Sequence, residues 1–467
     1  MPHDGRFMSE SDAFSWYMEK DPELRSTVVA VAWLSDSPDW PLFRRKLDRA
    51  SRLAPGFRQR PWEPPARLST PRWATDSTFD LDWHLRRVAA PEPRTADTVL
   101  DMARLAAMTG FDRTRPLWEF TLVEGLQAEQ AALVMKMHHS LTDGIGGVAL
   151  AYLLVDDRPT PSTEGPEVVA PPGEDITMNR LVIEGIVHQA ARGTGAVVDV
   201  LRRTPGALAA AARHPVTTAT NTTATAASLA RMVRPVRSTM SPLITQRGPG
   251  RKLSMIDVGL GELKQAAKRG GGTLNDGFVA AVAGGLRLYH EVHGAKVGDL
   301  LMTLPISIRR PDDPLGGNRI TLERLAVPVG EPDVNARITE IHRRCLTTRA
   351  EPAIAYTNAV AAVLNMLPAS VPGSMLKHVD FLASDVPGFD RPAYLCGSRI
   401  TAFHSFGPTI GAALNATLFS YVSECCIGVT IDSDAVPDYD VLVECLRAGF
   451  AEVTGRLPAD SSGAPAC

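Results

Sequence analysis

The sequence of 467 residues lacks the features that would place it in a membrane or outside the cell. No stretch approaches the roughly 20 consecutive apolar residues that cross a bilayer as a helix. The start, Met1 to Arg6, is polar and does not form the apolar core of a secretory signal. Only six cysteines are present, all in the C-terminal third and without the spacing of a metal site. We therefore expect a reduced, cytoplasmic protein with buried thiols.

The motifs of several common enzyme classes are also missing. There is no Cys-x-x-Cys or His-x-x-x-His pair, so we predict no metal site. There is no glycine-rich loop to bind phosphates, which argues against an enzyme that binds ATP or NAD on such a loop. There is no Gly-x-Ser-x-Gly elbow, which argues against a serine hydrolase. A net charge of −3 gives no reason to expect nucleic-acid binding.

The charge is distributed unevenly along the chain. Between residues 176 and 252 only Glu184 and Asp199 oppose eleven basic residues, so this segment carries +9 and the remainder −12. One interpretation is a connector whose arginines are solvated. Another is a peripheral surface that binds the anionic phospholipid of a membrane or lipid droplet. The sequence leaves both open.

The hydrophobic pattern predicts a mixed α/β protein in two halves. Residues 1–175 form the first half, residues 176–240 a basic helical connector, and residues 241–467 the second half. The ligand site is expected in the cleft between the halves. The principal helices are predicted over 41–53, 95–108, 178–203, 273–289 (with a thread of small residues), 334–348, 352–366 and 439–453. Extended segments are predicted over 27–34, 79–85, 118–124, 131–137, 300–308, 321–329, 378–383, 399–406, 412–419 and 424–431.

The most informative stretch runs from His138 to Gly144. It follows a predicted buried strand and precedes a predicted helix, so two imidazoles stand where a strand opens onto a cleft. Histidine is the side chain best suited to take a proton near neutral pH. Neighbouring strand residues face opposite sides, so we expect one histidine in the site and the other in the core. His139 and Asp143 could bind a metal together, but the sequence offers no further ligand nearby.

Several segments together resemble the bacterial wax ester synthase/acyl-CoA:diacylglycerol acyltransferase family, part of the wider group of CoA-dependent acyltransferases. The wider group's His-His-x-x-x-Asp-Gly signature matches His138 to Gly144. The narrower family's motifs are matched, in the expected order, by Pro116 to Glu119, Asn275 with Asp276, Leu304 to Arg309, Gly317 to Arg319, and Ser384 to Gly388. Two positions depart from the family pattern: Asp385 stands in place of asparagine and Phe389 in place of proline.

The resemblance implies two chloramphenicol-acetyltransferase-like domains with a cleft or tunnel between them, joined by the helical connector. It implies an enzyme that uses acyl-CoA as co-substrate, holds no permanent cofactor, and acylates diacylglycerol or a long-chain alcohol. His139 would be the general base, and His138 would support the strand end. Asp143 would form a structural ion pair across the site, for which Arg309 is the candidate partner.

The resemblance assigns the remaining motif residues to catalysis or to support of the site. Asn275 is expected to donate to the oxyanion of the tetrahedral intermediate, or else to cap a helix. Substrate binding or structural support is expected of Gly144, Pro116, Leu117, Trp118, Asp276, Asn318, Ser384 and Asp385. Because Asp385 departs from the family, a specialised-metabolism acyltransferase with a non-lipid alcohol or amine acceptor is an alternative. A non-catalytic lipid-droplet protein and a metal hydrolase are two further alternatives.

Overall fold

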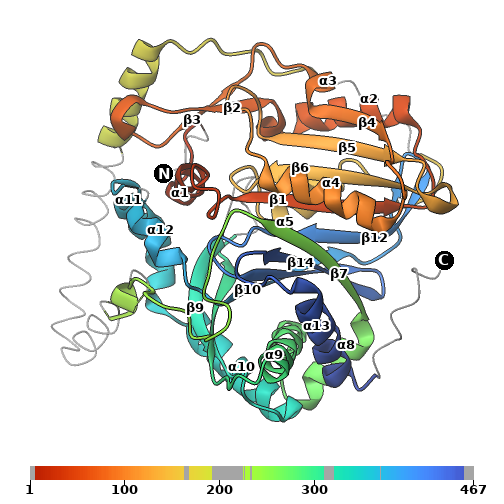
Figure 1. The fold of residues 1–467 in the computed structure, drawn as a ribbon. Helices are drawn as coiled ribbons and strands as arrows, with labels where there is room; N and C mark the ends of the chain where they lie inside the picture. The colour runs from red at the N-terminus through yellow and green to blue at the C-terminus, as the bar shows by residue number, and fades with distance from the viewer. Residues whose placement is uncertain are drawn as a thin grey trace, which may run out of the picture.

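The computed structural model describes residues 6–161, 168–191, 225, 227–231, 234–309, 320–368 and 370–456. Its strands form two six-stranded sheets and a small two-stranded ribbon. The first sheet lies in the upper part of Figure 1 and the second in the lower part. The mixed α/β class expected from the sequence is confirmed.

The first sheet has the strand order β11-β12-β1-β6-β5-β4, in which only β4 and β5 are parallel. Its strands are β1 (Thr27–Leu34), β4 (Leu85–Ala89), β5 (Trp118–Glu124), β6 (Ala131–His138), β11 (Tyr394–Leu395) and β12 (Ser398–Phe406). The central strands β1 and β6 are almost wholly apolar because neighbouring elements cover both of their faces. Residues 394–406 therefore complete a sheet that the N-terminal part of the chain begins.

The second sheet has the order β7-β14-β13-β10-β8-β9, in which β10 runs parallel to both of its neighbours. Its strands are β7 (Arg251–Gly259), β8 (Leu300–Ser307), β9 (Ile320–Val327), β10 (Phe381–Phe389), β13 (Leu414–Tyr421) and β14 (Glu424–Asp432). The ribbon pairs β2 (Gln59–Trp62) with β3 (Arg72–Thr75).

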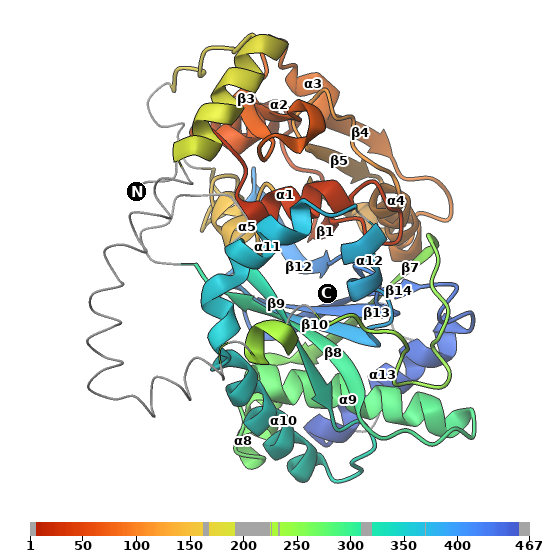
Figure 2. The same ribbon diagram turned by 90° about the vertical axis from the view of Figure 1, so that its left-hand side faces the viewer.

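Helices cover the outer faces of the sheets and one end of the space between them (Figures 1 and 2). They are α1 (Glu10–Met18), α2 (Trp40–Leu53), α3 (Leu81–His84), α4 (Ala96–Met108), α5 (Gly144–Ala151), α8 (Leu260–Arg269), α9 (Leu274–Val292), α10 (Val334–Arg349), α11 (Thr357–Asn365), α12 (Ser370–Leu376) and α13 (Tyr439–Thr454). Among these helices, none combines the length and apolar character needed to span a bilayer.

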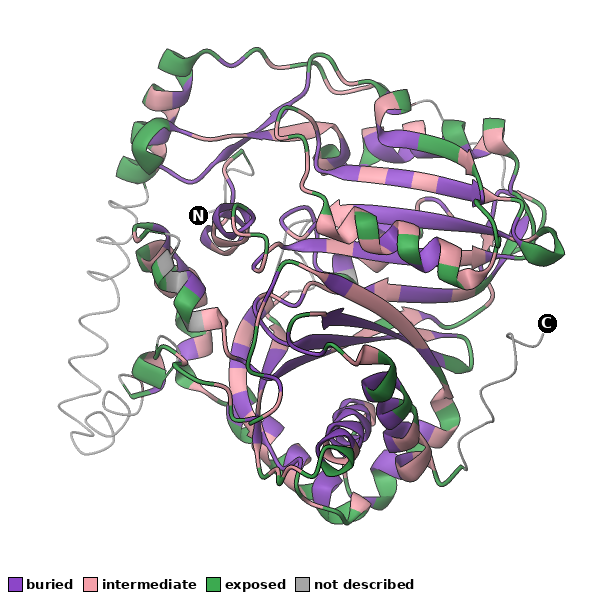
Figure 3. Cartoon of the chain, in the orientation of Figure 1, coloured by how far each residue is buried: buried purple, intermediate pink, exposed green. Residues whose placement is uncertain are grey.

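Helix α9 forms the core below the second sheet, and most of it is buried (Figure 3). Its small residues allow the backbone of α13 to come very close. A Cβ atom on Gly285 would lie 2.6 Å from Leu446 Cα, and one on Gly449 would lie 2.3 Å from the Gly285 nitrogen. Glycine is required at such a backbone contact because any side chain would force the helices apart.

Most of the expected elements are confirmed to within a few residues. The strand expected over 378–383 begins at Phe381 and runs to Phe389 as β10, and the helix expected over 178–203 is described only to residue 191. Two further expectations differ in kind. The extended segment expected over 79–85 is wrong, because the Asp80 side chain accepts a hydrogen bond from Asp82 N and starts the short helix α3 there. The single helix expected over 352–366 is instead a 3₁₀ turn, Pro352–Tyr356, followed by α11. Five of the six cysteines lie in described ranges, and these five are buried free thiols.

The described part of the basic segment uses several of its arginines inside the fold. Helical residues 178–191 pack against the ribbon through Leu181, and Arg180 pairs with Glu184 at 2.8 Å. Arg251 lies 3.4 Å from Asp432 and donates to backbone carbonyls. Arg251 is therefore not simply solvated, whereas Arg180 lies at the surface with its side chain 46% exposed. The region from 192 to 224 lies outside the described residues, and the proposed boundaries at 175 and 240 stay predictions.

Candidate active site

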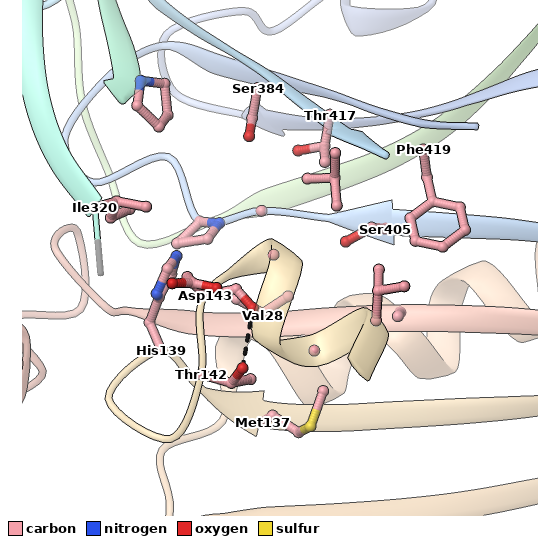
Figure 4. A pocket seen from close by; sticks show the side chains of 18 of the residues that line it. Val28, Met137, His139, Thr142, Asp143, Ile320, Ser384, Ser405, Thr417 and Phe419 are labelled. Carbon is pink, nitrogen blue, oxygen red and sulfur yellow. Dashed lines mark hydrogen bonds between the residues drawn. The ribbon is translucent and has the colours of Figure 1, made fainter. Parts of the chain in front are cut away.

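The turn after β6 carries the His-His-x-x-x-Asp-Gly motif (Figure 4). His138 ends the strand, and α5 begins at Gly144, as the sequence predicts. Asp143 caps this helix, because its Oδ1 accepts a hydrogen bond from Gly146 N at 2.7 Å. The turn places His139 and Asp143 between the two sheets.

His139 stands where two cavities meet. Their volumes are about 190 and 140 Å³, and both are lined by His139, Ile320, Leu322 and Ile410. Burial lowers the pKa of His139 below its ordinary value of 6.5, and the Asp143 carboxylate opposes this shift only in part. The imidazole is therefore neutral near pH 7 and can accept a proton from a bound hydroxyl group.

The larger cavity is mostly apolar and takes its wall from both sheets (Figure 4). Aromatic rings contribute much of this wall: Phe57, Phe120, Phe403 and Phe419. The rings of Phe403 and Phe419 stack with their centroids 4.4 Å apart. The hydroxyl-bearing residues Ser405 and Thr417 also line it. An apolar cavity with a few polar groups suits a hydrocarbon chain that carries one reactive polar group.

His138 is fully buried; it contributes to the lining of the larger cavity but not to that of the smaller one. Its Nδ1 accepts a hydrogen bond from Ser140 N at 3.1 Å, and its Nε2 lies 3.5 Å from Glu19 Oε2. Burial raises the pKa of Glu19, but its interaction with His138, the hydrogen bond from Ser26 N and the charge of Arg25 outweigh burial and hold that pKa below its ordinary value. His138 thus ties the end of β6 to Glu19. Glu19 stands in no motif, so the sequence offered no signal for it.

Asp143 and Arg309 form an ion pair between the two halves of the chain. Arg309 follows β8, and its Nη2 and Nε lie 2.8 and 3.2 Å from Asp143 Oδ2. The Asp143 side chain is 1% exposed and that of Arg309 13%. The pairing suggested for these two residues is therefore present in the structure, and with the helix cap it occupies both carboxylate oxygens.

The Pro116, Leu117 and Trp118 segment supports the histidine turn from the neighbouring strand. Leu117 O accepts a hydrogen bond from His138 N at 3.0 Å. Trp118 is fully buried, and its Nε1 donates to Phe57 O at 2.9 Å. These residues hold the end of β6 in place.

Residues of β10 approach the turn from the second sheet. Ser384 and Asp385 line the larger cavity together with Val386. A Cβ atom added to Gly144 would lie 2.7 Å from Val386 Cγ2, so only glycine allows α5 to start this close to β10. Burial raises the pKa of Asp385 to about 6, while the more distant charges of Arg349 and Lys264 oppose the shift.

The structure does not bring the Asn275 and Asp276 pair to the histidines. Both lie in the first turn of α9 and line neither of the cavities that meet at His139. Asp276 Oδ2 accepts hydrogen bonds from Thr273 N and from His342 Nδ1, at 2.8 and 2.7 Å. The pair therefore begins a helix, and the oxyanion role expected of Asn275 has no geometric support. Asn318 lies outside the described residues.

One group of side chains within the described ranges has the composition of a metal site: Asp257, His404 and Cys426. His404 Nδ1 accepts a hydrogen bond from Trp33 Nε1 at 3.1 Å, which leaves the proton on Nε2, directed at Asp257 Oδ1 at 2.9 Å. Both ring nitrogens are thus engaged, Nδ1 by a residue of the same sheet and Nε2 by Asp257 of the second sheet. None of the three residues lines the cavities at His139.

The two mixed α/β halves and the histidine turn between them agree with the acyltransferase class that the sequence motifs imply. The model described as the wax ester synthase/diacylglycerol acyltransferase catalytic domain matches residues 8–278. The C-terminal domain model of the same family matches residues 316–454. The chain belongs to this family and is an acyl-CoA-dependent acyltransferase.

Individual relatives agree with this assignment. A putative diacylglycerol O-acyltransferase of Mycobacterium tuberculosis is 35% identical over 440 residues, which cover 93% of this chain and 89% of the relative. The wax ester synthase/diacylglycerol acyltransferase of Marinobacter aquaeolei shares the fold with a TM-score of 0.61 and 21% identity, over 96% of this chain and 100% of that one. The first condensation domain of the calcium-dependent antibiotic synthetase does so with a TM-score of 0.62 and 15% identity, over 97% and 98%.

Proposed function

We propose that this protein transfers a fatty acyl group from acyl-CoA to the hydroxyl group of diacylglycerol or of a long-chain alcohol, forming triacylglycerol or wax esters. The observation that carries the proposal is the position of His139 at the junction of two cavities. Two substrates can reach one neutral imidazole from different sides. The aromatic and aliphatic wall of the larger cavity favours hydrocarbon chains over polar acceptors.

The chemistry needs one general base and no covalent enzyme intermediate. His139 takes the proton of the acceptor hydroxyl as its oxygen attacks the thioester carbonyl carbon. The tetrahedral intermediate then expels the CoA thiolate, which recovers the proton from His139. A C–O bond forms and the C–S bond breaks. Ser140 is a poor candidate for a nucleophile, because it is buried against His138 and lines neither cavity at His139.

Two side-chain contacts would position this base. The Asp143–Arg309 pair would hold α5 and β8 together on one side of the turn. The contact between His138 and Glu19 would fix the strand end on the other. Neither contact moves a proton in the reaction, so both pairs are assigned positioning roles.

We expect CoA release from palmitoyl-CoA to depend on the acceptor. Purified full-length protein should release CoA with dioleoylglycerol or hexadecanol, and hardly any without an acceptor, because transfer is direct. Release is followed with a thiol reagent, and the lipid product by thin-layer chromatography. A stoichiometric burst of CoA without acceptor would contradict direct transfer. Absence of turnover with both lipids would contradict the lipid-acceptor assignment.

The alternative of a non-lipid alcohol or amine acceptor rests on Asp385. Its carboxyl group lines the same cavity as His139 and could bind an amine or a polar hydroxyl group. The surrounding wall is nevertheless mostly apolar, which is why the lipid acceptor is preferred. Peripheral association with a membrane or lipid droplet would bring lipid acceptors to the protein. We propose a cytoplasmic location for the enzyme.

Replacing Asp385 with asparagine should stabilise the protein at neutral pH. Burial raises the pKa of this carboxyl from 3.8 to about 6. The group therefore costs no stability below pH 3.8, where it is protonated in both states, and the folded protein loses stability as the pH rises through 6. The Asp385→Asn variant avoids this loss, so its free energy of unfolding at pH 8 should exceed that of the wild type by up to about 3 kcal/mol. The difference should shrink at pH 5. Urea denaturation at both pH values measures it, and an equal difference at both would refute the assignment.

A further inference from the structure

A cluster of arginines lines a third cavity, with a volume of about 640 Å³. The cluster consists of Arg231, Arg234, Arg237 and Arg324, and the rest of the wall is formed by Pro235, Val236, Ser238 and Leu301. The short helix at 227–231 is held to β9 by a hydrogen bond, because Arg324 Nη2 donates to Arg231 O at 2.9 Å. No carboxylate belongs to the described lining of this cavity.

The positive charge of the cluster is only partly neutralised within the described residues. Arg231 pairs with Glu351 at 2.8 Å. Arg234 and Arg237 are exposed and form no ion pair with any other described residue. Burial lowers the pKa of Arg324; Glu323 opposes this shift, and the neighbouring charge of Arg234 adds to it. Guanidinium groups held this close to one another favour a polyanion, and phosphate is the anion that their geometry fits best.

Strand β9 carries residues of both the cluster and the cavities at His139. Arg324 also lines the smaller cavity, which His139 lines as well. Every second residue of a strand points to the same face, so β9 places on one face Ile320, Leu322 and Arg324. The rise per residue puts Arg324 about 13 Å along the strand from Ile320, which lines both cavities at His139. The wall between them combines apolar side chains with hydroxyl groups, including those of Ser15, Thr303, Thr321 and Thr357. Such a wall suits an arm that carries amide groups.

We infer that the arginine cluster binds the phosphate groups of the acyl-CoA donor, and that the pantetheine arm follows the smaller cavity to His139. The inference rests on the proposed function, because it assumes that a CoA thioester is the donor. The larger cavity is then left for the acyl chain and the acceptor. Anionic phospholipid headgroups carry the same phosphate chemistry, but Arg324 lines both the cluster's cavity and the cavity that His139 lines, which favours CoA.

The test compares CoA with pantetheine, which lacks the phosphates. Calorimetry on the full-length wild type should give tighter binding of CoA than of pantetheine. The Arg234→Ala/Arg237→Ala variant should bind CoA about 10- to 100-fold more weakly and lose most of this preference, since charge-assisted hydrogen bonds are removed. The KM for palmitoyl-CoA should rise with little change in kcat. The control, Arg158→Ala, removes an arginine that is also exposed but lies outside the cluster, and it should keep the preference.

Two outcomes would overturn the inference. In the first, the double variant keeps the wild-type preference for CoA over pantetheine, and the wild type carries out acyl transfer. The proposed function would then hold without the inference. In the second, the double variant loses its binding to phosphatidylglycerol vesicles, measured against phosphatidylcholine vesicles, but keeps its affinity for CoA. That result would assign the cluster to a lipid surface. Arginine-dependent CoA binding without acceptor-dependent CoA release would instead refute the proposed function and leave the inference standing.

Discussion

Replacing His139 with alanine is expected to lower kcat/KM for acyl transfer by about 10²- to 10⁴-fold, the usual contribution of a general base. The wild-type rate should stay high below pH 6.5, since burial lowers the pKa of this imidazole and keeps it neutral there. Initial rates of CoA release between pH 5 and 8, with saturating acceptor, measure both effects. Palmitoyl-CoA binding should change little, because the imidazole does not hold the phosphates.

The matched control for this substitution is His139→Gln. Glutamine fills similar space and can form hydrogen bonds, but it cannot accept the proton, so its loss of rate should equal that of alanine. Circular dichroism should be the same for wild type and both variants, because His139 lies at a cavity wall rather than in a packed core. A glutamine variant with near wild-type rate would rule out the proton-acceptor role.

Replacing Arg309 with methionine is expected to destabilise the protein by about 3–5 kcal/mol, because it leaves the Asp143 carboxylate buried without its charged partner. Methionine keeps a long, flexible side chain in the same space. The free energy of unfolding from urea denaturation measures the loss. Because the pair joins α5 to the second half of the chain, acyl transfer should fall as well.

The double variant Asp143→Asn/Arg309→Met separates the charge from the packing. Asparagine still caps α5, since it is as good an N-cap residue as aspartate. Removing the buried charge should recover a substantial part of the stability lost in Arg309→Met alone. If the two substitutions add without coupling, the ion pair contributes nothing and its positioning role is refuted.

Much of the site was predictable because it is local. The turn from His138 to Gly144 follows from an apolar strand, an N-cap aspartate and small residues, all of which act within a few positions. The pairing of Asp143 with Arg309 came from the family resemblance, and the geometry agrees with it. The role of Asn275 illustrates the opposite case. Its motif is compatible both with a helix start and with an oxyanion donor, and only its position in α9 favours the helix start.

The sequence by itself determined the mixed α/β class, the positions of most strands and helices, and the histidine turn, because these depend on periodicity and on caps close along the chain. Only the tertiary structure decided that β12 completes the first sheet and brings Phe403 and Ser405 to the cavity, because pairing between β1 and β12 depends on surfaces some 370 residues apart in sequence. It likewise decided that His139 lines two cavities and that Arg324 lies beside the other arginines of the cluster. Cavities form where packing between distant elements is incomplete, and no local pattern encodes that.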